Sequence, residues 1–448
     1  MLASRKRPAP LLLFIALVFI GIWYHSRDSD RIYTQWLSSI ESRPIKAPAN
    51  RTLGFGAVVV VSKEGSSRRH PLIQAANVTD IDLTIPQQPE WTEGDVQRFI
   101  NGQPDAVKGS ILAWLGHHNA LRWFLDSGLE TALILEDDVD WDIRLRSVQI
   151  PLAASVTREL LPPVRSRHPH INKNPNRTQY WGDQDAWDVL YLGHCGDYFD
   201  VIEEDGPKTD RQSYNLSTLA HKLYYDPTLP SWLDMHPFTQ SLFRLLGMPE
   251  RTRVMHRSKL PLCSFGYAVT RLAAERLLND LAPPKLKKDG ARAFDVALLH
   301  SCNKGENTPS PTPEWQRSKD SQNPNLRSKY PSPGLRCWTL NSELFHHMPG
   351  MSEIDMLSAL QGEKPGLPPV DRAAQAQVVY RNETTNIDCG FWNGAFAFDD
   401  DDMDRLHYLQ EKVGRQGMCL KEKKPHENTF YPPQTTLDGS SVTTVSGA

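Results

Sequence analysis

A short apolar run leads directly into a cluster of acids in the segment Thr131-Ala-Leu-Ile-Leu-Glu136-Asp137-Asp138-Val139-Asp140-Trp141-Asp142. Five carboxylates fall within its last seven residues. An apolar run of this length, bounded by polar residues, is typical of a parallel β-strand that is buried on both faces. Ligands of open α/β sheets bind outside the carboxyl ends of such strands, so we expect the acids to face a ligand rather than the core.

The clustering of these acids indicates a divalent-cation site. Neighbouring carboxylates repel one another unless a positive charge lies between them. A hard cation such as Mn²⁺ or Mg²⁺ takes oxygen ligands, which it typically shares between one or two protein carboxylates and substrate phosphates. The alternative is that the acids form only a solvated loop or a helix N-terminus.

The composition is that of an ordinary globular protein. A chain of 448 residues is long enough for one large domain or two smaller ones with a substantial core. Lysine and arginine together number 50 against 53 acids, a formal net charge of −3, so the overall charge gives no reason to expect a nucleic-acid partner. The six cysteines show no C-x-x-C spacing, which argues against a zinc site.

The N-terminus carries an uncharged apolar segment, residues 8–24, after the basic cluster Arg5-Lys6-Arg7. Its 17 residues are at the lower end of what spans a bilayer core. Trp23 and Tyr24 occupy the place where signal-peptide cleavage needs small residues, and aromatic residues there suit a membrane interface. We therefore expect a signal anchor at 8–24, with residues 1–7 in the cytosol and the rest in the lumen; a cleaved signal peptide is the alternative.

If the body is lumenal, the N-glycosylation sequons and the cysteines become informative. Five N-glycosylation sequons lie beyond the apolar segment and become possible glycan sites, with acceptors at Asn50, Asn77, Asn176, Asn215 and Asn382. In an oxidising lumen six cysteines can form three disulfides, and 15 pairings are open. Cys302 and Cys337 are the pair we expect, because they bracket a low-complexity segment. The short anchor suits the thin membranes of the endoplasmic reticulum or Golgi, and so a single-pass type II glycoprotein.

The remaining chain divides into a stem at 25–52, a catalytic body at 53–423 with a low-complexity insertion at 303–334, and a disordered tail at 424–448. Residues 55–62 form a β-branched run that predicts the first and central strand. The turn after it carries Arg68 and Arg69, whose guanidinium groups could hold a diphosphate; a solvated loop is the alternative.

Strands and helices alternate along the body, which is the pattern of an α/β sheet. Thr92 and Thr270 are the expected N-caps of two helices. The other expected elements are a helix at 110–126, strands at 131–135, 187–193 and 263–269, helices at 271–281 and from 293 onward, and a core segment at 338–347.

Four segments resemble, in this order, glycosyltransferase family 25: Gly109-Ser-Ile-Leu-Ala-Trp-Leu-Gly-His-His-Asn-Ala-Leu, Ala132-Leu-Ile-Leu-Glu-Asp-Asp-Val, Trp187-Asp-Val-Leu-Tyr-Leu-Gly and Gly266-Tyr-Ala-Val-Thr-Arg-Leu-Ala-Ala-Glu-Arg-Leu-Leu. That family holds lipopolysaccharide glycosyltransferases and collagen galactosyltransferases. The resemblance covers roughly residues 53–347. It implies a GT-A-type nucleotide-sugar-binding domain with a mostly parallel central sheet, dependent on Mn²⁺ or a similar cation, with UDP-galactose as donor in the best-known members.

The resemblance also assigns site residues. Glu136, Asp137 and Asp138 match the acidic motif of the family, so Glu136 and Asp138 are the expected metal ligands, and Glu136 and Asp137 are expected to contact the nucleotide. Gly266 and Tyr267 are further expected nucleotide-binding residues. The arginine-rich turn that the family has after its first strand is reduced here to Arg68-Arg69, behind a Lys-Glu-Gly-Ser-Ser loop.

The expected function is transfer of a sugar, galactose in the first instance, from a UDP-sugar to a glycan or glycoprotein acceptor. The acceptor hydroxyl must lose a proton, and Asp295, a lone acid at the start of a helix, is the candidate base. Its alternative role is that of a helix N-cap. Two other classes stay open: a non-catalytic calcium- or carbohydrate-binding lumenal protein, and a metal-dependent phosphodiesterase.

Overall fold

The computed structural model describes residues 47–103, 106–161, 180–197, 216–235, 239–240, 242–243, 246–306, 333–348, 386–391 and 396–420. The expected cytosolic tail, the signal anchor and most of the stem lie outside these residues, as do positions 307–332 of the expected insertion and the expected tail from 424. No helix within the described ranges is long and apolar enough to cross a bilayer. The described residues all belong to one compact unit.

The folded body begins earlier than the expected boundary at residue 53. Ala49 is buried, and its backbone N–H donates to the carbonyl of Arg146 at 2.9 Å. The expected insertion is also shorter than predicted at its start, because residues 303–306 form the last turn of a helix. The ordered body therefore extends at both places beyond what composition indicates.

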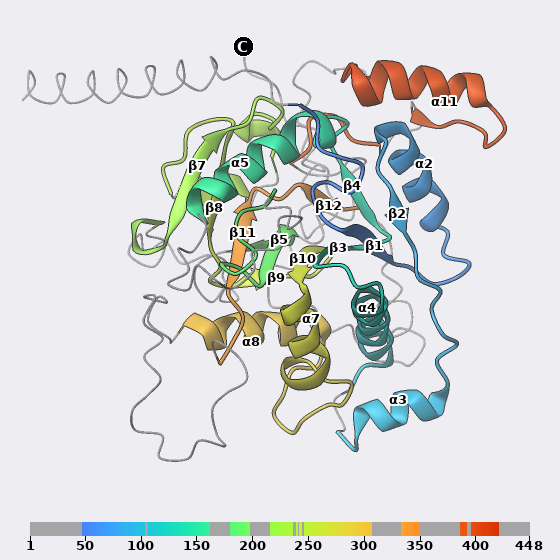
Figure 1. Cartoon of the computed structure of the whole chain (residues 1–448), viewed down its shortest axis with the longest axis vertical. Helices are drawn as coiled ribbons and strands as arrows, with labels where there is room; N and C mark the ends of the chain where they lie inside the picture. Colours follow the sequence, from blue (N-terminus) through green and yellow to red (C-terminus); the bar gives the residue numbers. More distant parts are fainter. Residues whose placement is uncertain are drawn as a thin grey trace, which may run out of the picture. The chain divides into compact units, whose positions relative to one another are not determined.

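A single eight-stranded sheet forms the centre of the body (Figure 1), in the order β2-β1-β3-β10-β5-β11-β8-β7. Six strands point in one direction, and β8 and β10 run against them. The fold is thus the expected α/β class with a mostly parallel sheet, similar to a Rossmann domain. Its strands are β1 (Ala57–Val61), β2 (Leu83–Thr84), β3 (Thr131–Glu136), β5 (Val189–Gly193), β7 (His221–Tyr225), β8 (Thr252–Arg257), β10 (Gly266–Thr270) and β11 (Cys337–Asn341).

The first strand is present, but the prediction that it lies at the centre was wrong. β1 is next to the edge strand β2. The antiparallel strand β10 inserts beside β3, with Gly266 opposite Leu135, and the other four strands add beyond it. A β-branched run indicates that a strand is buried on both faces of the sheet. It does not indicate how many other strands lie on either side of it within the sheet.

Helices cover both faces of the sheet. Side chains alternate along a strand, so Val58 and Val60 of β1 face one core while Ala57 and Val59 face the other. The first core is covered by α2 (Arg69–Thr79) and α5 (Ile150–Leu160). The second is covered by α4 (Lys108–Asp126), α7 (Arg271–Arg276) and α8 (Phe294–Glu306), which lie together on one side of the sheet in Figure 1.

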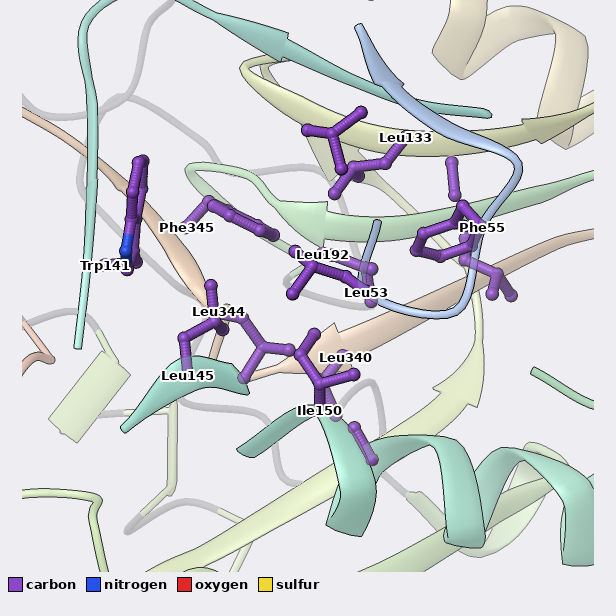
Figure 2. Close-up of a cluster of buried hydrophobic side chains, with 14 of the residues drawn as sticks. Leu53, Phe55, Leu133, Trp141, Leu145, Ile150, Leu192, Leu340, Leu344 and Phe345 are labelled. Atoms are coloured by element: carbon purple, nitrogen blue, oxygen red, sulfur yellow. The ribbon is translucent and has the colours of Figure 1, made fainter. Parts of the chain in front are cut away.

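A short second sheet begins directly after Asp138 and connects the acidic segment to residues 345–347. It pairs β4 (Val139–Trp141) with β12 (Phe345–His347) in antiparallel fashion. Trp141 and Phe345 lie in the first core, shown in Figure 2, with their ring centroids 6.2 Å apart at 71°. Burying each aromatic side chain contributes roughly 1.5–3 kcal/mol, so this pair holds β12 firmly against the acidic segment.

Three disulfides staple the body. Cys302–Cys337 is the expected bridge and is confirmed; it ties α8 to β11 across a sequence separation of 35. Cys195–Cys263 joins the loops that follow β5 and precede β10. Cys389–Cys419 closes the C-terminal segment, which includes α11 (Met403–Leu409) and shares a small apolar core with Val78 of α2.

Candidate functional site

The acidic segment lies at one edge of the sheet, where β1 and β3 end side by side. Val61 is paired with Glu136, so Ser62 and Asp137 follow at the same level. The hydroxyl of Ser62 donates to Oδ2 of Asp137 at 2.7 Å. As the sequence predicts, the acids gather at the carboxyl ends of parallel strands.

Asp138 is the centre of a compact charged cluster. Oδ2 of this carboxylate lies 3.1 Å from Nη1 of Arg68 and 3.2 Å from Nε2 of His347. The pairing of β4 with β12 places His347 opposite Val139, which is why a residue so distant in sequence reaches the acids. Arg68 also approaches Asp137, with Nε 3.2 Å from Oδ1, so its guanidinium bridges two carboxylates.

Burial and charge set the protonation of this cluster. Burial raises the pKa of Asp138, but the neighbouring His347 and Arg68 outweigh it, and the pKa lies below its ordinary value. For Asp137, burial outweighs the hydrogen bonds from Ser62 and Ser66, so the pKa is raised. Burial lowers the pKa of His347, yet the carboxylate of Asp138 more than reverses this and brings it to about 9.

The other oxygen of Asp138 supports a cation site. Oδ1 is buried and has no hydrogen-bond partner. A buried carboxylate oxygen left unpaired is costly, and a hard cation is a ligand that would satisfy it. Asp138 and His347 are thus the side chains that fit a metal best. Within the described part of the chain no group of three or more His, Cys, Asp or Glu is arranged as a metal centre, so the other ligands would come from phosphate oxygens and water.

Glu136, the other expected metal ligand, is engaged elsewhere. Its Oε1 lies 3.3 Å from Nε2 of His117 on α4 and accepts a hydrogen bond from Ser264 at 3.3 Å. The side chain is 31% exposed, so the carboxylate also reaches the surface. The structure therefore pairs Asp138 with His347 and Glu136 with His117, and the sequence did not indicate either pair.

Asp140 and Asp142 serve the fold. Both carboxylates are buried and accept backbone N–H groups of the C-terminal segment, Asp140 from Phe391 and Asp142 from Cys389. Asp142 also forms a two-pronged ion pair with Arg144. The interpretation of these acids as a solvated loop is wrong for both positions.

Gly266 and Tyr267 lie inside the sheet. A Cβ on Gly266 would come within 3.0 Å of the Cα of Gly193, so a glycine is needed where β10 and β5 approach. Tyr267 is fully buried, and its hydroxyl lies 3.1 Å from Nδ1 of His117. Tyr267 therefore presents no exposed surface in the structure, and its hydroxyl is connected to the acidic segment through His117.

Asp295 lies in the first turn of α8, one residue after its start, so it does not occupy the N-cap position. Its Oδ1 accepts the N–H of Val296 at 2.8 Å. Burial raises its pKa, and the charge of Glu136 raises it further. Asp295 and Glu136 are thus close enough to interact, which the sequence alone does not indicate.

Arg69 begins α2, and its Nε is buried without a hydrogen-bond partner. It makes none of the contacts to the acids that Arg68 makes. Of the two arginines, Arg68 is the one that the fold brings to the site.

One cavity of the body lies away from the acids. Its volume is about 450 Å³, and it is lined by residues of α4, α8 and the loop between α7 and α8, among them Trp114, Leu286 and His300. None of the acids at 136–142 lines it.

The sequence alone indicates a packing or surface role for His117 and does not point to His347, yet both lie beside acids of the site. Each belongs to a His-His pair, His117-His118 and His346-His347, and in each pair one member meets an acid of the site. The pairs were visible in the sequence, but only the β4–β12 pairing and the packing of α4 show which member faces the acids. A comparison of the chain with models of known protein families gives no match.

Proposed function

We propose that this protein is a metal-dependent glycosyltransferase that transfers a sugar from a UDP-sugar to a hydroxyl of a glycan or glycoprotein. One observation carries the proposal. The carboxylate of Asp138 lies at the carboxyl edge of an α/β sheet, with Oδ2 held by Arg68 and His347 and Oδ1 buried without a partner. The resemblance to glycosyltransferase family 25 supplies the donor class, with galactose as the first sugar to test.

Asp138 and His347 would hold a Mn²⁺ or similar ion together with two phosphate oxygens. When bound, such a cation offsets the negative charge that develops on the departing diphosphate. Arg68 would contribute a second positive group on the same side, because its planar guanidinium can move between carboxylate and phosphate oxygens with similar geometry. Asp137, held by Ser62, would face the nucleotide beside it.

Asp295 is the proposed base for the acceptor hydroxyl. A carboxylate works best as a base when its pKa is raised toward the working pH, and burial and Glu136 both raise the pKa of Asp295. Its place on α8, on the face of the sheet covered by α4, separates it from Arg68 on the side of α2.

Two other classes are less well supported. A calcium loop would need Asp138, Asp140 and Asp142 as joint ligands, but Asp140 and Asp142 accept backbone N–H groups of the C-terminal segment. A two-metal phosphodiesterase needs several His and Asp ligands close together, and the residues that the structure describes contain no such group. Three disulfides agree with a lumenal body behind the proposed signal anchor, in the endoplasmic reticulum or Golgi.

Binding of UDP to the purified full chain, with and without Mn²⁺, tests this function. We expect binding that depends on the cation, and slow hydrolysis of UDP-galactose in the absence of an acceptor. Tight UDP binding that chelators leave unchanged would contradict the metal-dependent site. Failure to bind any nucleoside diphosphate would contradict the transferase itself.

A further inference from the structure

A line of three side chains leads from the buried core to Glu136. The hydroxyl of Tyr267 lies 3.1 Å from Nδ1 of His117, and Nε2 of His117 lies 3.3 Å from Oε1 of Glu136. Tyr267 and His117 are buried, whereas the side chain of Glu136 is 31% exposed. We call these three residues the tyrosine–histidine–glutamate line.

The two polar contacts of His117 have one consistent direction when the imidazole is neutral. A neutral histidine has one donor and one acceptor nitrogen, and a carboxylate only accepts. In the tautomer that suits both neighbours, Nε2 carries the hydrogen and faces Oε1 of Glu136, while Nδ1 accepts from the hydroxyl of Tyr267. The hydroxyl of Tyr267 would favour this tautomer of His117, and the ring of His117 lies directly against the carboxylate of Glu136.

The imidazole plane is fixed as well. The ring of His117 stacks on Phe294 with centroids 4.4 Å apart and planes 7° apart. Phe294 immediately precedes Asp295 at the start of α8. Ser264 donates to the same Oε1 of Glu136 that faces His117. Both of these contacts fall on Oε1, while the side chain as a whole is 31% exposed.

The neighbouring residue His118 shows what a purely structural histidine looks like here. Its Nε2 lies 2.7 Å from the carbonyl oxygen of Ala282 and 3.1 Å from Nε1 of Trp114. Burial lowers its pKa to about 3, so it stays neutral within the core. His118 makes no contact with an acid of the site among the described residues, although it is as deeply buried as His117.

We propose that Tyr267 and His117 are positioning residues that hold Glu136 as a fixed hydrogen-bond acceptor for a hydroxyl of the transferred sugar. The proposal rests on the proposed function. It assigns Glu136 to the sugar and leaves the cation to Asp138 and His347. A carboxylate oxygen held in one orientation accepts a hydroxyl without losing side-chain freedom, and this favours the bound sugar in the geometry that reacts.

Substitutions at His117 separate positioning from packing. His117→Gln keeps an N–H near the place of Nε2, whereas His117→Leu fills the site with apolar atoms. For His117→Leu we expect turnover of UDP-galactose to fall on the order of 10-fold or more, while the affinity for UDP, which has no sugar, stays within about 2-fold. His117→Gln should recover most of the turnover. A packing role would give the opposite order, with leucine tolerated better than glutamine.

His118→Leu and His118→Gln are the matched controls. They should lower the melting temperature, but turnover per folded molecule and the affinity for UDP should stay close to wild type. Tyr267→Phe removes only the hydroxyl and keeps the ring, so it is the variant that decides if His117→Leu does not fold. It should lower turnover several-fold without changing the affinity for UDP.

Three results would overturn the proposal. One is full turnover in a folded His117→Leu or Tyr267→Phe protein, and another is an equal loss in the His117 and His118 variants. The third is a parallel loss of affinity for UDP, which would place Glu136 at the nucleotide or the cation. A wild-type protein that does not bind UDP at all overturns the proposed function, and the role of the line falls with it.

Discussion

At the scale of single residues, the side chains of the acidic segment fall into three groups with different partners. Asp137 and Asp138 meet Arg68 and His347, Glu136 meets His117, and Asp140 and Asp142 hold the C-terminal segment. The sequence predicts that acids gather here, because an apolar run followed by carboxylates is typical of a buried strand that ends at a ligand-binding edge. It does not predict the division, because the partners come from segments up to about 250 residues away.

The titration of His347 gives a prediction for metal binding. Its pKa is about 9 in the metal-free protein, so the ring carries a proton at pH 7, and a cation must displace that proton to bind Nε2. We expect the affinity for Mn²⁺ to rise about tenfold per pH unit between pH 7 and 8.5, with release of about one proton. Calorimetry in buffers of different ionisation enthalpy measures both quantities.

The raised pKa of His347 has the opposite effect on the stability of the metal-free protein, which falls as the pH rises. The folded pKa of His347 lies above the value of about 6.5 for an unfolded histidine. The ion pair with Asp138 therefore stabilises the metal-free protein fully below pH 6.5, and this contribution is lost as the pH rises through 9. His347→Gln should remove both pH dependences. An Mn²⁺ affinity that stays flat from pH 6 to 9 in the wild type would exclude His347 as a ligand.

At the scale of secondary structure, local sequence signals predicted which segments form helices and strands. They predicted less well where those elements lie in the fold. Thr92 and Thr270 cap their helices as expected, with Thr92 and Asp95 forming a reciprocal capping box. The helix expected at 110–126 is α4, and the strands expected at 131–135 and 187–193 are β3 and β5. The three-residue strands β4 and β12 were not predicted, because they are too short for a periodic pattern and are defined only by each other.

The close approach of β5 and β10 makes Gly193 sensitive to substitution. A Cβ there would lie 2.9 Å from the Cα of Gly266 and 2.9 Å from the Cβ of Phe345. Gly193→Ala should therefore destabilise the protein by about 1–3 kcal/mol and displace β12, which carries His347. Chemical denaturation together with Mn²⁺ titration measures both effects.

Gly94→Ala is the control for this substitution. Gly94 lies in α3 (Glu93–Ile100), and a Cβ there meets no atom closer than 3.5 Å. Alanine has the higher helix propensity, so this variant should be neutral or up to about 1 kcal/mol more stable. If Gly193→Ala were as stable as Gly94→Ala, the packing of β5 against β10 would be looser than described.

The Cys302–Cys337 bridge ties α8 to β11 on either side of the segment 307–332. Removing it lengthens the loop that the unfolded chain can explore, so Cys302→Ser together with Cys337→Ser should cost about 2–4 kcal/mol of unfolding free energy. Turnover at low temperature should change little, because neither cysteine lies near the acids. Peptide mapping without reduction is the first check, and free thiols at both positions would contradict the bridge.

At the scale of the whole molecule, the class of fold was predicted from the alternation of strands and helices, and the sheet confirms it. The order of the strands was not predicted from the sequence. The strand β10 lies antiparallel between β3 and β5, and no local signal in the sequence marks such an insertion. Pairing of the cysteines illustrates the same limit. One bridge followed from the segment that it brackets, while Cys195–Cys263 and Cys389–Cys419 depend on the tertiary fold.

The topology proposed for the whole chain predicts a lumenal body that stays attached to the membrane. Of the five sequons, those at Asn50 and Asn77 present exposed asparagines in the described body. Glycosidase treatment should increase gel mobility, and the cell-associated protein should retain residues 8–24 and resist alkaline extraction. A secreted product that begins between residues 24 and 35 would show a cleaved signal peptide instead.

The Mn²⁺ dependence of UDP-galactose hydrolysis in Asp138→Asn, with Asp142→Asn as control, tests most directly the proposal that Asp138 holds a catalytic cation. Asparagine keeps the volume but removes the charge, so the rate should fall on the order of 100-fold or more and the Mn²⁺ affinity should drop. Asp142→Asn weakens the contacts to Arg144 and Cys389, so it should lower stability and leave the rate per folded molecule unchanged. Full hydrolysis and unchanged Mn²⁺ affinity in Asp138→Asn would contradict the account.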